Sequence, residues 1–150
     1  MYSKQDASLV KKKFWTSLGQ YMRPLPGASG EAVNWLNYKT GVKHLYFRMD
    51  ADKQQASIAI ELKQDDATIR HHYLQQLQQV KGILEQITGE QWEWISDEPD
   101  EHGNMISRIG TTLRSINIFN EADWPAIISF LKPRMIALDE FWDLVRERFV

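Results

Sequence analysis

Two alternating segments around a short polar stretch constrain the fold of this chain more than any other feature. Residues 44–49 and 56–63 each place an apolar side chain at every second position. Successive side chains of a strand point to opposite faces, so each segment has one apolar and one polar face. The pattern therefore predicts a β-hairpin with one buried face, joined through residues 50–54. The apolar positions are Leu45, Phe47 and Met49, followed by Ala56, Ile58, Ile60 and Leu62.

The second segment ends in Glu61 and Lys63, which the same alternation places on one face. Metal-dependent nucleases of the restriction-endonuclease class use a Glu-x-Lys pair of this kind, together with a second carboxylate. A turn centred near residues 52–53 would put Glu61 opposite His44, and Asp50 roughly 20 Å away at ~3.3 Å per residue. We therefore take Glu61, Lys63 and His44 as candidate catalytic residues, and expect the second carboxylate to be missing.

Helical periodicity predicts three main helices, over residues 6–22, 65–88 and from Asp123 to the C-terminus. Gly89 is expected to end the second helix in a left-handed conformation, and Pro133 to kink or divide the third. Further strands are expected at 91–95 and 105–113. Residues 33–38 could form a short strand or a single helical turn, and we favour the strand. The 150 residues suit one domain, 1–150. We expect an α+β fold with a mixed, mostly antiparallel sheet of four to five strands, in the order α-β-β-β-α-β.

Composition excludes several classes of function. The chain has no cysteine, which excludes disulfides and thiolate chemistry, and its formal net charge of -2 argues against an overall electrostatic attraction to nucleic acid. It contains no apolar run of membrane-spanning length and no signal-peptide pattern, so we expect a cytoplasmic protein and no membrane partner. We expect no resident metal or cofactor, with Mg²⁺ needed only if the chain is a nuclease.

Several side chains could instead serve binding, each with a plainer structural interpretation. Basic residues of the first helix could contact DNA or form a solvated helix face, and paired tryptophans could stack on bases or belong to the core. The wide apolar face of the last helix could cover the sheet or form a homodimer or partner interface. The candidate binding residues are Lys11, Lys12, Arg48, Trp92, Trp94 and Arg108.

The expected order of elements resembles the core of restriction-endonuclease-like proteins. A second resemblance is carried by residues 46–51, 58–62, Tyr73, Leu77, Lys81, 84–85, 89–90, 92–94, 107–109 and 123–125. These stretches resemble an uncharacterised bacterial family of domains of unknown function, the DUF4268 type. The resemblance extends over about residues 10–150 and implies a DNA-related or defence setting, without established catalytic residues.

These observations favour a non-catalytic binding or accessory domain on a degenerate nuclease-like scaffold. A protein partner or a homodimer is the expected partner, and DNA is the second choice. The alternative is an active metal-dependent DNA nuclease that uses Glu61 and Lys63. A third hypothesis is nucleic-acid binding through the first helix.

Overall fold

The computed structural model describes residues 3–149, which form a curved sheet with helices on one side. No helix within this range is both long and apolar enough to cross a membrane. In chain order the elements are α1 (Lys4–Met22), β1 (Leu45–Ala51), β2 (Gln55–Leu62), α2 (Ala67–Gln79), α3 (Lys81–Thr88), β3 (Glu93–Pro99), β4 (Met105–Arg114), a 3-10 turn η1 (Glu121–Asp123), α4 (Trp124–Val145) and a second turn η2 (Arg146–Phe149).

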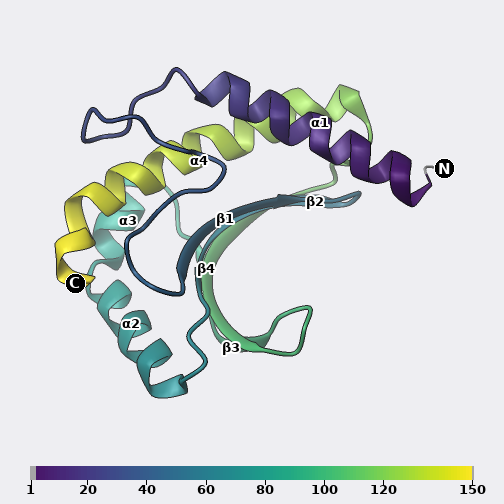
Figure 1. The fold of residues 1–150 in the computed structure, drawn as a ribbon. Coiled ribbons are helices and arrows are strands. Elements are labelled where there is room, and N and C mark those ends of the chain that lie inside the picture. The colour runs from purple at the N-terminus through teal and green to yellow at the C-terminus, as the bar shows by residue number, and fades with distance from the viewer. Residues whose placement is uncertain (1–2, 150) are drawn as a thin grey trace.

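The four strands form one sheet in the order β1-β2-β4-β3, and every neighbouring pair is antiparallel. The helices lie along the convex side of this sheet, whereas its concave side is open (Figure 1). The α+β class is therefore confirmed. The expected order α-β-β-β-α-β is not the one found, because the segment 33–38 forms no strand.

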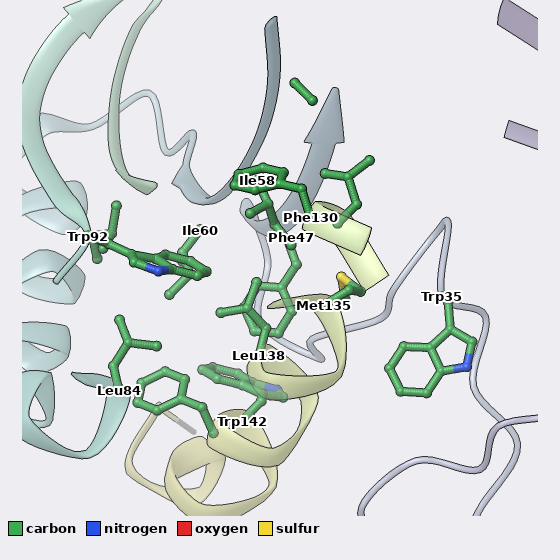
Figure 2. Packing of buried hydrophobic residues seen from close by; sticks show 14 of the residues in the cluster. Trp35, Phe47, Ile58, Ile60, Leu84, Trp92, Phe130, Met135, Leu138 and Trp142 are labelled. Carbon is green, nitrogen blue, oxygen red and sulfur yellow. The ribbon is translucent and has the colours of Figure 1, made fainter. Parts of the chain in front are cut away.

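The convex side of the sheet builds the core. Phe47, Ile58 and Ile60 of the hairpin face Leu138 and Trp142 of α4 (Figure 2). These side chains are nearly or fully buried, and each contributes roughly 1.5–3 kcal/mol of transfer free energy. The alternation seen in the sequence therefore determines which face of the hairpin meets α4.

Residues 33–38 were expected to be a strand but form part of a loop held against α4. Asp139 of α4 accepts hydrogen bonds from the hydroxyl of Tyr38 at 2.6 Å and from the backbone N–H of Ala28 at 2.7 Å. The indole of Trp35 donates to the carbonyl of Leu25 at 3.1 Å. Hydrogen bonds that involve side chains thus hold this loop in place, where a strand would need backbone hydrogen bonds to a neighbouring strand.

The hairpin register differs by two residues from the expected one. Glu61 pairs with Tyr46 rather than with His44, because the turn is centred one residue later along the chain. Asp52 determines this turn: its Oδ1 accepts hydrogen bonds from the N–H groups of Gln54 and Gln55. The change brings Asp50 closer to the level of Glu61 than the sequence suggested.

Two further expectations about helices are corrected or refined. The helix expected over residues 65–88 is divided into α2 and α3 at Val80, whose φ of -112° is not helical. Gly89 ends α3 with φ 73°, as predicted. The last helix continues through Pro133 without division.

Candidate functional site

The concave side of the sheet carries polar side chains and encloses a hollow of about 400 Å³. The alternation that points Ile58 and Ile60 to the core points Ser57 and Glu61 to this side. We call this space the concave hollow. It is lined by Arg48, Met49, Asp50, Gln55, Ser57, Glu61, Lys63, Glu98, Pro99, Asp100, Glu101, Ile106 and Arg108.

An ion pair and a second arginine lie at the centre of the hollow. The Nε of Arg48 donates to Oε1 of Glu61 at 2.9 Å, and Arg108 of β4 lies directly opposite Glu61 of β2. The side chain of Glu61 is only 12% exposed, whereas that of Arg48 is 51% exposed. The buried Nε of Arg108 has no hydrogen-bond acceptor within residues 3–149. Glu61 is thus partly neutralised, and Arg108 retains an unused donor.

The smallest residues of the face lie beside this centre. Ala59 of β2 pairs with Gly110 of β4. A Cβ added at Gly110 would lie 2.9 Å from the Cβ of Ala59 and 2.9 Å from the carbonyl oxygen of Ile58. A glycine in a strand permits this close approach of backbones, so the pair allows the sheet to curve around the hollow.

The loop between β3 and β4 supplies an acidic margin of Glu98, Asp100 and Glu101. Asp100 holds the loop closed, since its Oδ1 accepts hydrogen bonds from the N–H groups of His102 and Asn104, both at 2.9 Å. Desolvation alone raises the pKa of Asp100. The two hydrogen bonds and the nearby charge of Lys63 outweigh it, so this pKa lies below its usual range.

The charge balance of the hollow is acidic. Three cationic side chains, Arg48, Lys63 and Arg108, face five carboxylates. Asp50 lies opposite Ser57, four positions along the strand from Glu61, or about 13 Å at 3.3 Å per residue. Within the described part of the chain, no three His, Asp or Glu side chains are grouped so that they could hold a metal ion.

Only part of the candidate catalytic set comes together. Glu61 and Lys63 both line the concave hollow, whereas His44 lines a separate hollow formed by residues 37–46. His44 has a positive φ of 64°, and its carbonyl accepts a hydrogen bond from the N–H of Lys63 at 2.8 Å. Its position is therefore at the start of the hairpin and outside the concave hollow.

The candidate binding residues are similarly divided. Arg48 and Arg108 lie in the concave hollow, whereas Lys11 and Lys12 belong to α1 in the helical layer. Lys11 lies over the ring of Phe119 at 5.8 Å, and Lys12 is exposed.

The two candidate tryptophans differ in burial. Trp92 precedes β3, is only 5% exposed and donates its indole N–H to Glu90 at 2.9 Å. Trp94 is half-buried against the core, with Lys81 over its ring. Trp92 therefore belongs to the core, and Trp94 packs against it.

Sequence reasoning missed the group that fixes the irregular part of β3. The buried guanidinium of Arg70 donates twice to Oδ1 of Asp97, at 3.0 and 2.7 Å, and His71 contacts Oδ2 at 2.6 Å. Asp97 has φ 56° within the register shift between Ile95 and Glu98. These contacts join α2 to the strand that carries Glu98 into the hollow. The sequence held one signal for this group: Arg70 lies at helical spacing from the apolar residues Leu74 and Leu77, on the face of α2 that is buried.

Comparison with known protein families places most of the chain in a described family. A profile for the family described as "Domain of unknown function (DUF4268)" matches residues 10–146. No curated protein matches, and no solved structure matches.

Proposed function

The chain belongs to the DUF4268 family of domains of unknown function, and we propose that it is a non-catalytic domain whose concave sheet face binds a segment of a partner protein. The observation that carries this proposal is the pairing of the Glu61 carboxylate with neighbouring arginines. Its carboxylate already accepts a hydrogen bond from Arg48 and faces Arg108, inside a hollow that remains open to solvent. A carboxylate paired in this way is poorly placed to act as a metal ligand.

The charges of the hollow favour a cationic protein segment over nucleic acid. Binding of a phosphate backbone relies on a concentration of Lys and Arg, and here carboxylates outnumber cations. A segment with basic side chains would meet Glu98, Asp100 and Glu101 at the margin. Its carbonyl groups or an acidic side chain would meet the guanidinium of Arg108, which lines the hollow.

The same proposal places the domain in the bacterial cytoplasm, as an accessory to a DNA-related or defence protein on a degenerate nuclease-like scaffold. The bacterial, DNA-related or defence setting is supported by the sequence resemblance described above, and the cytoplasmic location by the expectation from the sequence pattern. The structural argument for binding at the concave hollow does not depend on that setting.

A cleavage assay tests the non-catalytic part of the proposal. Supercoiled plasmid and single-stranded DNA would be incubated with Mg²⁺ or Mn²⁺ and the wild type, Glu61→Ala or Lys63→Ala. We expect no cleavage above background for any of the three proteins. Cleavage by the wild type that is lost in both variants would overturn the proposal and establish a nuclease.

A binding assay tests the choice of partner class. Fluorescence anisotropy would compare a labelled eight-residue oligoarginine, an oligoaspartate of the same length and a short DNA duplex. We expect binding of oligoarginine alone, at least tenfold weaker for the double variant Glu98→Lys with Asp100→Lys. The control of equal net charge is Glu140→Lys with Glu147→Lys, at two exposed positions of α4 and η2. Equal losses in both variants, or preferential binding of the duplex, would contradict a cationic partner at this face.

A further inference from the structure

The outer edge of β1 carries backbone groups that nothing in the described chain satisfies. Two hydrogen bonds, from Lys63 N to His44 O and from Asp52 N to Gln55 O, show which residues of the hairpin are hydrogen-bonded pairs. The backbone N–H and C=O groups of even-numbered residues of β1 therefore point towards β2. The N–H and C=O groups of odd-numbered residues therefore point to the outer edge, where β1 is the last strand of the sheet (Figure 1).

The ends of this edge are closed, and its middle is open. At one end, Leu45 donates to Val42 O and accepts from Thr40 Oγ1. At the other end, the N–H of Ala51 donates to the side chain of Asp50 at 2.9 Å. Between them, the N–H and C=O groups of Phe47 and Met49 have no hydrogen-bond partner within residues 3–149.

The opposite edge of the sheet is protected in ways that β1 is not. Strand β3 presents acidic side chains, contains a register shift between Ile95 and Glu98 and ends at Pro99. Charge, irregularity and proline are the usual means by which edge strands avoid pairing with other chains. The register of β1 is regular from Leu45 to Ala51 and contains no proline. Of the two edges, β1 is therefore the one built to accept another strand.

The side chains of β1 indicate which strand it accepts. Arg48 and Asp50 lie two residues apart on the concave side, with Met49 between them. In an antiparallel pairing of two copies centred on Met49, Arg48 of each copy lies opposite Asp50 of the other. Phe47 then lies opposite Ala51, so a large residue meets a small one. The segment is complementary to itself in both charge and size.

We propose that β1 pairs with β1 of a second copy of this chain about a two-fold axis at Met49, which joins two sheets into one of eight strands. The Met49 groups bond to each other, and those of Phe47 bond to Ala51 of the second copy. The N–H of Ala51 then leaves the carboxylate of Asp50, which becomes free to meet Arg48 of the second copy. Arg48 uses only Nε for Glu61, so its terminal nitrogens remain available.

Sedimentation equilibrium over a range of protein concentrations tests this pairing. We expect a reversible dimer for the wild type and at least tenfold weaker association for Arg48→Asp and for Asp50→Arg. An equimolar mixture of the two variants should recover association, because each introduced charge then faces its opposite. Lys12→Asp, at an exposed site on α1, is the control and should leave the dimer unchanged.

The mixture distinguishes pairing from loss of folding, since misfolded variants would not recover on mixing. A wild type that stays monomeric at all concentrations would overturn the proposal, as would a dimer that persists in both charge-reversed variants. Failure to recover association in the mixture, with both variants folded by circular dichroism, would also overturn it. None of these results depends on whether the concave hollow binds a basic peptide.

Discussion

Arg48 donates to Glu61 across the hairpin at 2.9 Å, although the residue directly opposite Glu61 is Tyr46. The contact is therefore diagonal, and it holds the guanidinium of Arg48 against the carboxylate that lies opposite Arg108. A diagonal pair lies within reach of long side chains on the same sheet face. This arrangement gives the concave hollow a defined centre while leaving it open.

Glu61→Gln should have little effect on stability. Arg48 is 51% exposed, and exposed ion pairs contribute at most about 1 kcal/mol. We expect the free energy of unfolding, measured in urea, to fall by less than about 1 kcal/mol. A loss several times larger would show that the centre of the hollow is required for folding, which would contradict its assignment as a binding surface.

Gly110→Ala should destabilise the protein, because the new Cβ would meet Ala59 and the backbone of Ile58 at 2.9 Å. Overpacking of this kind typically costs about 1–3 kcal/mol. Gly82→Ala in α3 is the matched control, since its Cβ would meet nothing within 4 Å. It should stabilise by roughly 0.5–1 kcal/mol through helix propensity. Equal effects in urea unfolding would contradict the close approach of β2 and β4.

Asp97 should contribute to the acid sensitivity of the fold. The hydrogen bonds from Arg70 and then from His71 hold the pKa of Asp97 below its usual range. The stabilisation of the fold by ionised Asp97 is therefore complete above the unfolded-state pKa of an aspartate, about 3.9. It is lost as the pH falls through the lower pKa that Asp97 has in the folded state.

Asp97→Asn should accordingly flatten the dependence of the melting temperature on pH between about pH 5 and pH 2. Glu140→Gln, at an exposed position of α4, serves as the control. A variant with the same acid dependence as the wild type would show that the Arg70–Asp97 contact does not contribute to stability.

Tyr38→Phe should loosen the loop that precedes β1. It removes the 2.6 Å hydrogen bond to the buried carboxylate of Asp139, at an expected cost of about 1–3 kcal/mol in urea unfolding. Tyr21→Phe is the control, because Tyr21 is 63% exposed. Equal stabilities for the two variants would contradict the role of Asp139 in holding this loop.

Tyr38 should also make the stability of the fold depend on pH in the alkaline range. Burial, followed by the hydrogen bond to Asp139, raises the pKa of Tyr38. Its contribution is therefore complete below the unfolded-state pKa of about 10 and is lost as the pH rises through the folded-state value. The stability difference between wild type and Tyr38→Phe should stay constant up to about pH 10 and shrink above it. A difference that shrinks already near neutral pH would contradict this assignment.

Much of the fold could be predicted from local patterns. The alternation in β1 and β2 identified their buried face, and the spacing of Phe14, Leu18 and Met22 identified α1. These signals are local because each depends on side chains a few residues apart. The hairpin register depended on the side chain of Asp52, which selects one turn among several compatible with the sequence.

The candidate site was predicted only in part, because it combines distant segments. Glu61 and Arg48 share a hairpin, so their pairing could be anticipated from alternation. Arg108 joins them only through the β2–β4 pairing, and the carboxylates of residues 98–101 only through the loop geometry that Asp100 imposes. The strand expected at 33–38 failed because Asp139, about a hundred residues away, holds that segment as a loop.

The most direct test of the central claim is to map where a cationic peptide contacts the protein. Amide chemical shifts of ¹⁵N-labelled protein would be followed during titration with oligoarginine. We predict shifts concentrated at Glu61, Lys63 and residues 98–108, with little change in α1 and α4. Shifts that instead follow the helical layer, or that are spread evenly over the surface, would contradict a binding site on the concave side.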